Sequence, residues 1–97
     1  MVRYKTAEAH ADANEALVRA VFDELHRTPP AGLRYASHRL ADRVTFVHLA
    51  TLENPSENPL VALASFKAFQ KDLKERCVEP PVVTELSVIG SYDAVTR

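Results

Sequence analysis

The stretch that decides the fold is LRYASHRLADRVTFVHLATLE, residues 33–53. Aliphatic, aromatic and β-branched side chains recur in both of its halves, and the polar segment Ala41-Asp42-Arg43 divides them. This composition around a short polar segment favours a β-hairpin. We therefore expect strands near 33–40 and 44–52, joined by a turn without glycine.

The length of this turn decides which side chains share a face, because a slip of one residue moves each side chain to the opposite face. With a three-residue loop, Leu40 lies opposite Val44. One face of the hairpin then carries Ala36, His38, Leu40, Val44, Phe46, His48, Ala50 and Leu52, and the other carries Leu33, Tyr35, Val47 and Leu49. With a two-residue loop, the two histidines lie on opposite faces. We favour the three-residue loop because it gathers the apolar positions that flank the turn.

The chain before the hairpin predicts a strand followed by a helix. Residues 2–6 alternate between basic and less polar side chains, which is the period of a half-exposed strand. We expect Thr6 to cap the helix that follows. The apolar stripe of this helix consists of Ala13, Leu17, Val18, Val21, Phe22 and Leu25. The pair Pro29-Pro30 ends it, because proline cannot continue a helix.

The chain after the hairpin predicts a second helix and a last strand. The segment Asn58-Pro59 is expected to start a short helical turn. The main helix begins near Ser65. Its apolar face consists of Phe66, Phe69, Leu73 and Cys77. We expect Pro80-Pro81 to end this helix, a strand to occupy residues 82–92, and residues 93–97 to form a C-terminal tail.

The order of the expected elements is strand, helix, strand, strand, helix, strand. This order predicts an α+β fold with the ferredoxin-like βαββαβ arrangement, an antiparallel sheet with two helices on one face. The 97 residues suit one domain, which we place at residues 1–92.

Composition and charge exclude several classes of function. The chain is 46% hydrophobic and 26% charged, with a net charge of −1, so it has no electrostatic footprint for nucleic acid or a membrane surface. The single cysteine cannot form an internal disulfide, and the first residues lack the apolar run of a signal peptide, so we expect a cytoplasmic protein. Two glycines leave no phosphate-binding loop. We expect no metal and no cofactor.

Apolar side chains on both faces of the hairpin predict a partner. Two helices can cover only one face of the sheet, which would leave Tyr35, Val47, Leu49 and Ile89 in water. A monomer seldom exposes so large an apolar patch, and its burial is worth roughly 25 cal/mol per Å². We therefore expect a homodimer formed through the sheet face.

Three short segments resemble the antibiotic biosynthesis monooxygenase-like family. PAGLRY (30–35) looks like the turn and strand opening of that family, TFVHL (45–49) resembles its third strand, and SFKAF (65–69) resembles its second helix. The resemblance implies a dimeric α+β barrel with a pocket between sheet and helices in each subunit. The family includes cofactor-independent oxygenases of phenolic or quinone-like substrates. Ala50, Leu52 and Ser65 stand where relatives often carry polar or aromatic side chains, so this chain would offer a substrate fewer hydrogen bonds.

His38 and His48 are the candidate catalytic residues. In the favoured register they share the face toward the helices, where a neutral imidazole could act as a base toward an acidic phenol. The resulting anion is electron-rich and reacts with oxygen. Histidines in half-buried strands also serve structure alone, which is the alternative. Two histidines are too few for a zinc site.

The candidate ligand-binding residues are Asn14, Phe46 and Leu52. Asparagine is a poor helix former, so Asn14 is either a surface residue or lies at the pocket edge. Tyr35 is expected in the dimer interface, and Tyr4 in either place. We predict a monooxygenase-like protein acting on a small aromatic or quinone-like substrate. The alternative is a non-catalytic homodimer that binds a small ligand or serves as an accessory protein.

Overall fold

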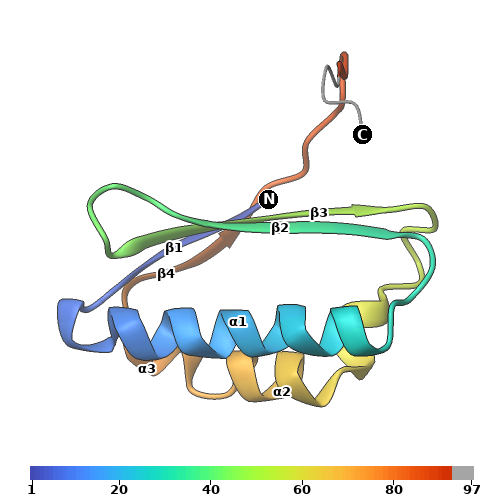
Figure 1. Cartoon of the computed structure of the whole chain (residues 1–97). Coiled ribbons are helices and arrows are strands. Elements are labelled where there is room, and N and C mark those ends of the chain that lie inside the picture. The colour runs from blue at the N-terminus through green and yellow to red at the C-terminus, as the bar shows by residue number, and fades with distance from the viewer. Residues whose placement is uncertain (93–97) are drawn as a thin grey trace.

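The computed structural model describes residues 1–92 and contains a four-stranded antiparallel sheet with the helices packed on one face (Figure 1). The strands are β1 (Val2–Thr6), β2 (Leu33–Arg39), β3 (Thr45–Leu52) and β4 (Cys77–Val83), in the order β2-β3-β1-β4. The α-helices are α1 (Ala11–Arg27), α2 (Ala64–Gln70) and α3 (Leu73–Arg76), and η1 (Glu8–His10) and η2 (Pro59–Ala62) are 3₁₀ turns. The predicted α+β class is confirmed, and the arrangement is compatible with a ferredoxin-like fold.

The hairpin of β2 and β3 forms as predicted, but its predicted register is wrong. Arg39 pairs with Phe46, and the amide of Leu40 donates to the carbonyl oxygen of Thr45, so residues 41–44 form the loop. The side chain of Asp42 accepts hydrogen bonds from the amides of Val44 and Thr45. This carboxylate stabilises a four-residue loop. Loops of four and two residues differ by an even number, so each side chain of the hairpin lies on the same face as in the two-residue alternative.

The second helical region is interrupted, which contradicts the prediction of one helix that reaches Cys77. Asp72 adopts a left-handed conformation with φ 60°, so α2 and α3 are separate and β4 begins at Cys77. The pair Pro80-Pro81 lies inside β4 rather than at a helix end. Proline is tolerated there because β4 is an edge strand, whose outer side has no neighbour to accept an amide hydrogen. The predicted strand over residues 82–92 is therefore wrong beyond Val83.

Helix α1 ends as predicted and begins differently. It stops at Arg27, immediately before Thr28 and the two prolines. The predicted cap by Thr6 is wrong, because η1 precedes α1 and the Thr6 hydroxyl donates to the carbonyl oxygen of Val44 at 3.3 Å. The buried face of α1 includes Asn14 in place of the predicted Ala13. The predicted turn at Asn58 is confirmed, since its side chain accepts from the amide of Leu60.

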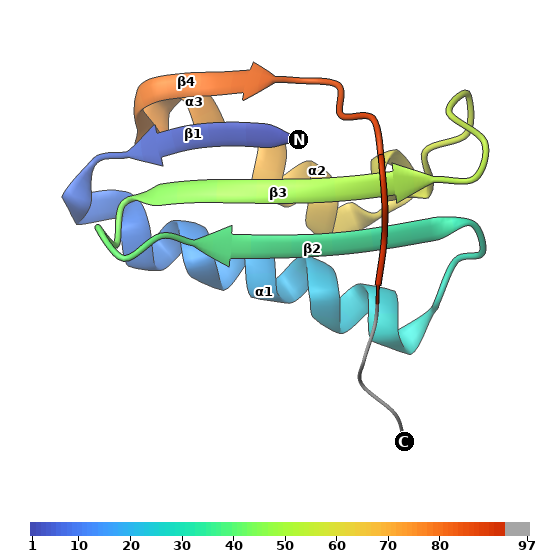
Figure 2. The same cartoon turned by 90° about the horizontal axis from the view of Figure 1, so that it is seen from above.

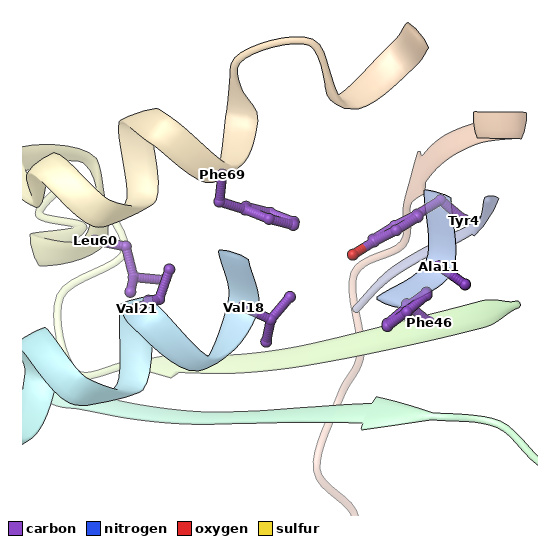
Figure 3. Close-up of a cluster of buried hydrophobic side chains, with 7 residues drawn as sticks. All are labelled: Tyr4, Ala11, Val18, Val21, Phe46, Leu60 and Phe69. Atoms are coloured by element: carbon purple, nitrogen blue, oxygen red, sulfur yellow. The ribbon is translucent and has the colours of Figure 1, made fainter. Parts of the chain in front are cut away.

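The core lies between the sheet and the helices (Figure 3). Its buried apolar residues are Tyr4, Ala11, Val18, Val21, Phe46, Leu60 and Phe69. The ring of Tyr4 stacks on Phe46 with centroids 5.5 Å apart. Glu24 of α1 accepts from both the amide and the hydroxyl of Ser65, which joins α1 to α2. These contacts hold the helices over β1 and β3.

The chain after β4 leaves the sheet on the face opposite the helices and crosses above β3 and β2 (Figure 2). Residues 84–92 of this segment have no regular secondary structure. Their large apolar side chains are exposed, and Ile89 and Tyr92 are 102% and 90% exposed. The predicted tail over residues 93–97 lies outside the described residues.

Candidate functional site

A cavity of about 520 Å³ lies between the sheet and α2, at the end of the sheet where β1 starts and β4 stops. Its walls come from the inner faces of all four strands and from η2, α2 and α3. The lining residues are Met1, Val2, Tyr35, His48, Ala50, Asn58, Leu60, Phe66, Phe69, Gln70, Leu73, Lys74, Pro81 and Val83. Most of these side chains are aliphatic or aromatic, and Lys74 carries the one charged side chain among them. The cavity therefore suits a small and largely apolar molecule.

His48 is the most buried polar group of this wall. It is 4% exposed and projects from β3 toward the helices. Aromatic rings surround its imidazole, with the centroid of Tyr4 at 5.3 Å, Phe69 at 5.4 Å and Tyr35 at 6.0 Å. An imidazole in such surroundings loses its hydration, which disfavours the charged form.

Both ring nitrogens of His48 have hydrogen-bond partners. Nδ1 lies 2.6 Å from the Ser37 hydroxyl and 3.2 Å from the Tyr35 hydroxyl, and Nε2 lies 2.7 Å from the Tyr4 hydroxyl. Ser37 is the direct partner of His48 in the β2–β3 ladder, which explains the short distance. The imidazole is therefore held in one orientation.

A second layer of polar side chains lies behind Tyr4. The amide nitrogen of Asn14 donates to the Tyr4 hydroxyl at 2.8 Å, and Arg76 Nε donates to Asn14 Oδ1 at 3.1 Å. Asn14 is 0% exposed, so α1 carries this amide entirely inside the core. Arg76, Asn14, Tyr4, His48 and Ser37 form one continuous chain of hydrogen bonds that reaches the cavity.

Burial keeps the imidazole of His48 and the hydroxyls of Tyr4 and Tyr35 neutral near pH 7. Desolvation, followed by the charge of His38, lowers the pKa of His48 from 6.5 to about 4. Desolvation likewise raises the pKa values of Tyr4 and Tyr35 above the ordinary value of 10.0. His48 and Tyr35 thus present neutral hydrogen-bonding groups in a largely apolar wall.

The structure separates the two candidate histidines. His38 pairs with Val47 and lies exposed on the open face of the sheet, whereas His48 pairs with Ser37 and faces the helices. The predicted shared face is wrong, because the four-residue loop changes the facing of β2. A joint role for the two imidazoles in one pocket is therefore excluded.

None of the three predicted ligand-binding residues lines the cavity. Asn14 joins the network but stands behind Tyr4. Phe46 is 2% exposed and belongs to the core. Leu52 is half-buried opposite Leu33, and it lies away from the cavity wall.

Sequence reasoning missed Arg76, Ser37 and the placement of Tyr35. Tyr35 was expected in a dimer interface, but in the observed register it faces the helices and stacks on Phe22 at 5.3 Å. The register of the hairpin places Ser37 and Tyr35 on the face toward the helices. The signal in the sequence for this register is Asp42, whose side chain stabilises the four-residue loop. Nothing local marks Arg76, which meets Asn14 across 62 positions of sequence.

Comparison with models of protein families, with curated proteins and with solved structures finds no match to this chain. Within residues 1–92, no group of three or more His, Cys, Asp or Glu side chains is arranged to hold a metal ion. In the same part of the chain, no helix combines the length and the apolar character needed to cross a membrane.

Proposed function

We propose that this protein binds a small aromatic or quinone-like molecule in the cavity beside His48. The observation that carries the proposal is a buried, neutral imidazole in the wall of a largely apolar cavity of about 520 Å³. That volume lies in the range of small-molecule sites, about 300–1,000 Å³. The rings of Phe66, Phe69 and Tyr35 offer surfaces on which a flat ligand can stack.

The reaction that fits such a ligand is oxygenation without a cofactor, as the resemblance to the antibiotic biosynthesis monooxygenase-like family implies. In this reaction the phenol ionises, and its electron-rich ring reacts with molecular oxygen. One oxygen atom enters the ring as a second carbonyl group, and the other leaves as water with two hydrogens of the substrate. His48 and Tyr35 both line the cavity, and we assign the stabilisation of the substrate oxygen to this part of the wall.

Oxygen consumption with 1-naphthol as the probe tests this proposal, and direct binding is measured under anaerobic conditions. Turnover that is lost in His48→Gln and kept in His26→Gln, an exposed control at the end of α1, supports the oxygenase. His38→Gln tests the remaining prediction for that residue, since loss of turnover there would place His38 in the reaction. Binding without oxygen consumption supports the alternative, a non-catalytic ligand-binding protein. Absence of binding refutes both.

The proposal extends to a homodimer formed through the open face of the sheet, as in a dimeric α+β barrel. Val47 and Leu49 lie on that face, and the segment that crosses above it exposes Leu86 and Ile89. A second copy that covers this surface would remove its apolar side chains from water. Light scattering should give twice the chain mass for the unaltered protein and the monomer mass for Ile89→Asp. A monomer in the unaltered protein refutes the dimer.

A further inference from the structure

Arg76 is the buried cation of the site, and its partners are unusual for a charged group. The residue is 9% exposed, and within residues 1–92 it takes part in no ion pair. Its guanidinium donates instead to Asn14 Oδ1 and to the carbonyl oxygens of Lys71 and Phe69. Burial of a cation without a carboxylate is costly, so these three acceptors are what holds the guanidinium in the core.

Arg76 fixes the direction of the hydrogen bonds that follow it, because a guanidinium has donors and no acceptor. The Asn14 atom that faces it must be the carbonyl oxygen, so the amide nitrogen faces the Tyr4 hydroxyl and donates to it. The hydroxyl hydrogen of Tyr4 then needs an acceptor, and His48 Nε2 lies 2.7 Å away. Among the described residues no buried side-chain nitrogen or oxygen lacks a partner, which agrees with this assignment.

The direction continues through His48 to the cavity wall. In a neutral imidazole one nitrogen donates and the other accepts, so acceptance at Nε2 places the hydrogen on Nδ1, which donates to Ser37 at 2.6 Å. His48 Nδ1 lies 3.2 Å from the Tyr35 hydroxyl. It cannot accept the hydrogen of that hydroxyl, because Nδ1 already carries a hydrogen of its own. The Tyr35 hydrogen is left for a molecule in the cavity.

We propose that Arg76 and Asn14 are positioning residues that, through Tyr4 and His48, make the cavity wall a hydrogen-bond donor at the Tyr35 hydroxyl, and so select ligands with an oxygen acceptor such as a carbonyl or phenolate. This inference rests on the proposed binding of a small aromatic molecule. It deepens that proposal, because apolar walls alone would not distinguish an acceptor from a donor. Arg76 and Asn14 act without touching the ligand.

The tautomer of His48 tests the direction without any ligand. Long-range ¹H–¹⁵N correlation spectra show which ring nitrogen carries the hydrogen, and we expect Nδ1–H in the unaltered protein. Asn14→Asp should change this to Nε2–H, because a carboxylate accepts from both Arg76 and Tyr4, and Tyr4 must then accept from His48. Asn54→Asp adds the same charge in an exposed loop and should leave the tautomer unchanged.

Two outcomes of this experiment would overturn the inference. One is Nε2–H in the unaltered protein, and the other is an unchanged tautomer in a folded Asn14→Asp variant. If that variant does not fold, the spectrum of the unaltered protein alone decides the direction.

Ligand selection is tested with acetophenone, which only accepts hydrogen bonds, and indole, whose N–H only donates. We expect the unaltered protein to bind acetophenone about tenfold more tightly, since the wrong partner leaves a buried group unpaired. Asn14→Asp should reverse the order. Equal affinities in the unaltered protein would refute the selection. Failure of both probes to bind, with Nδ1–H observed, would refute the proposed binding function and the selection while supporting the direction of the network.

Discussion

The neutral state of His48 predicts that the protein loses stability as the pH falls from 6.5 to 4. In this window the unfolded chain binds a proton at this histidine and the folded chain does not, because burial lowers the pKa of His48 from 6.5 to about 4. Protonation therefore favours the unfolded state. The two pKa values differ by about 2.5 units at ~1.4 kcal/mol per unit. Because the folded imidazole is half protonated at pH 4, slightly less than this full difference, ~3 kcal/mol, is lost between pH 7 and pH 4.

Urea unfolding followed by circular dichroism at pH 7, 6, 5 and 4 measures this loss. His48→Gln should lower the stability at pH 7 and flatten its dependence on pH, because glutamine does not titrate. His26→Gln replaces an exposed histidine and should keep the full slope. Hydrogen bonds hold the pKa values of Glu15, Glu24 and Asp42 below their ordinary values of 4.5, 4.5 and 3.8. Their contribution to stability is therefore lost as the pH falls through those ordinary values, and this part of the slope is common to all the variants. An equal slope in His48→Gln and the unaltered protein would refute the neutral imidazole.

Four further substitutions test the parts of the fold that position the site. Asp42→Ala removes the acceptor of the loop amides and should lower the urea midpoint, and amide exchange should rise first at residues 41–45. Glu24→Ala removes both bonds to Ser65, whereas Ser65→Ala removes only the hydroxyl bond, so the first should destabilise more than the second in urea unfolding; an equal loss would contradict this contact. Gly32→Ala forces a β-carbon onto a residue with φ 76°, which should cost ~1 kcal/mol or more in unfolding free energy.

Side-chain periodicity and the positions of prolines predicted much of the fold. The parts that they did not predict depend on single residues that do not alter the periodicity. The alternation in residues 2–6 and the prolines after Arg27 correctly placed β1 and the end of α1. The spacing of Phe66, Phe69, Leu73 and Cys77 continues across the break at Asp72, so periodicity alone predicted one helix. The left-handed conformation of Asp72 does not change the spacing of the apolar residues, so it cannot be detected from that spacing.

The site was less predictable than the fold because it depends on contacts between distant segments. The sequence singled out His48 correctly as a residue that faces the helices, and it singled out Asn14 because asparagine is unusual inside a helix. It could not show that these two side chains meet through Tyr4, since this requires the register of β1 against β3. The role of Arg76 depends further on the break between α2 and α3.

The loop between Arg39 and Phe46 constrains how this protein can vary in length. Insertion or deletion of one residue there would move every side chain of one strand to the opposite face of the sheet. If β3 stays in place, His38 of β2 would then face the helices and Ser37 would face away from them. Only changes by an even number of residues would keep Ser37 and Tyr35 on the same face as His48. Among evolved or engineered variants, the parity of this loop is therefore a test that can be read from sequence alone, and an odd change in length should coincide with loss of the buried polar network.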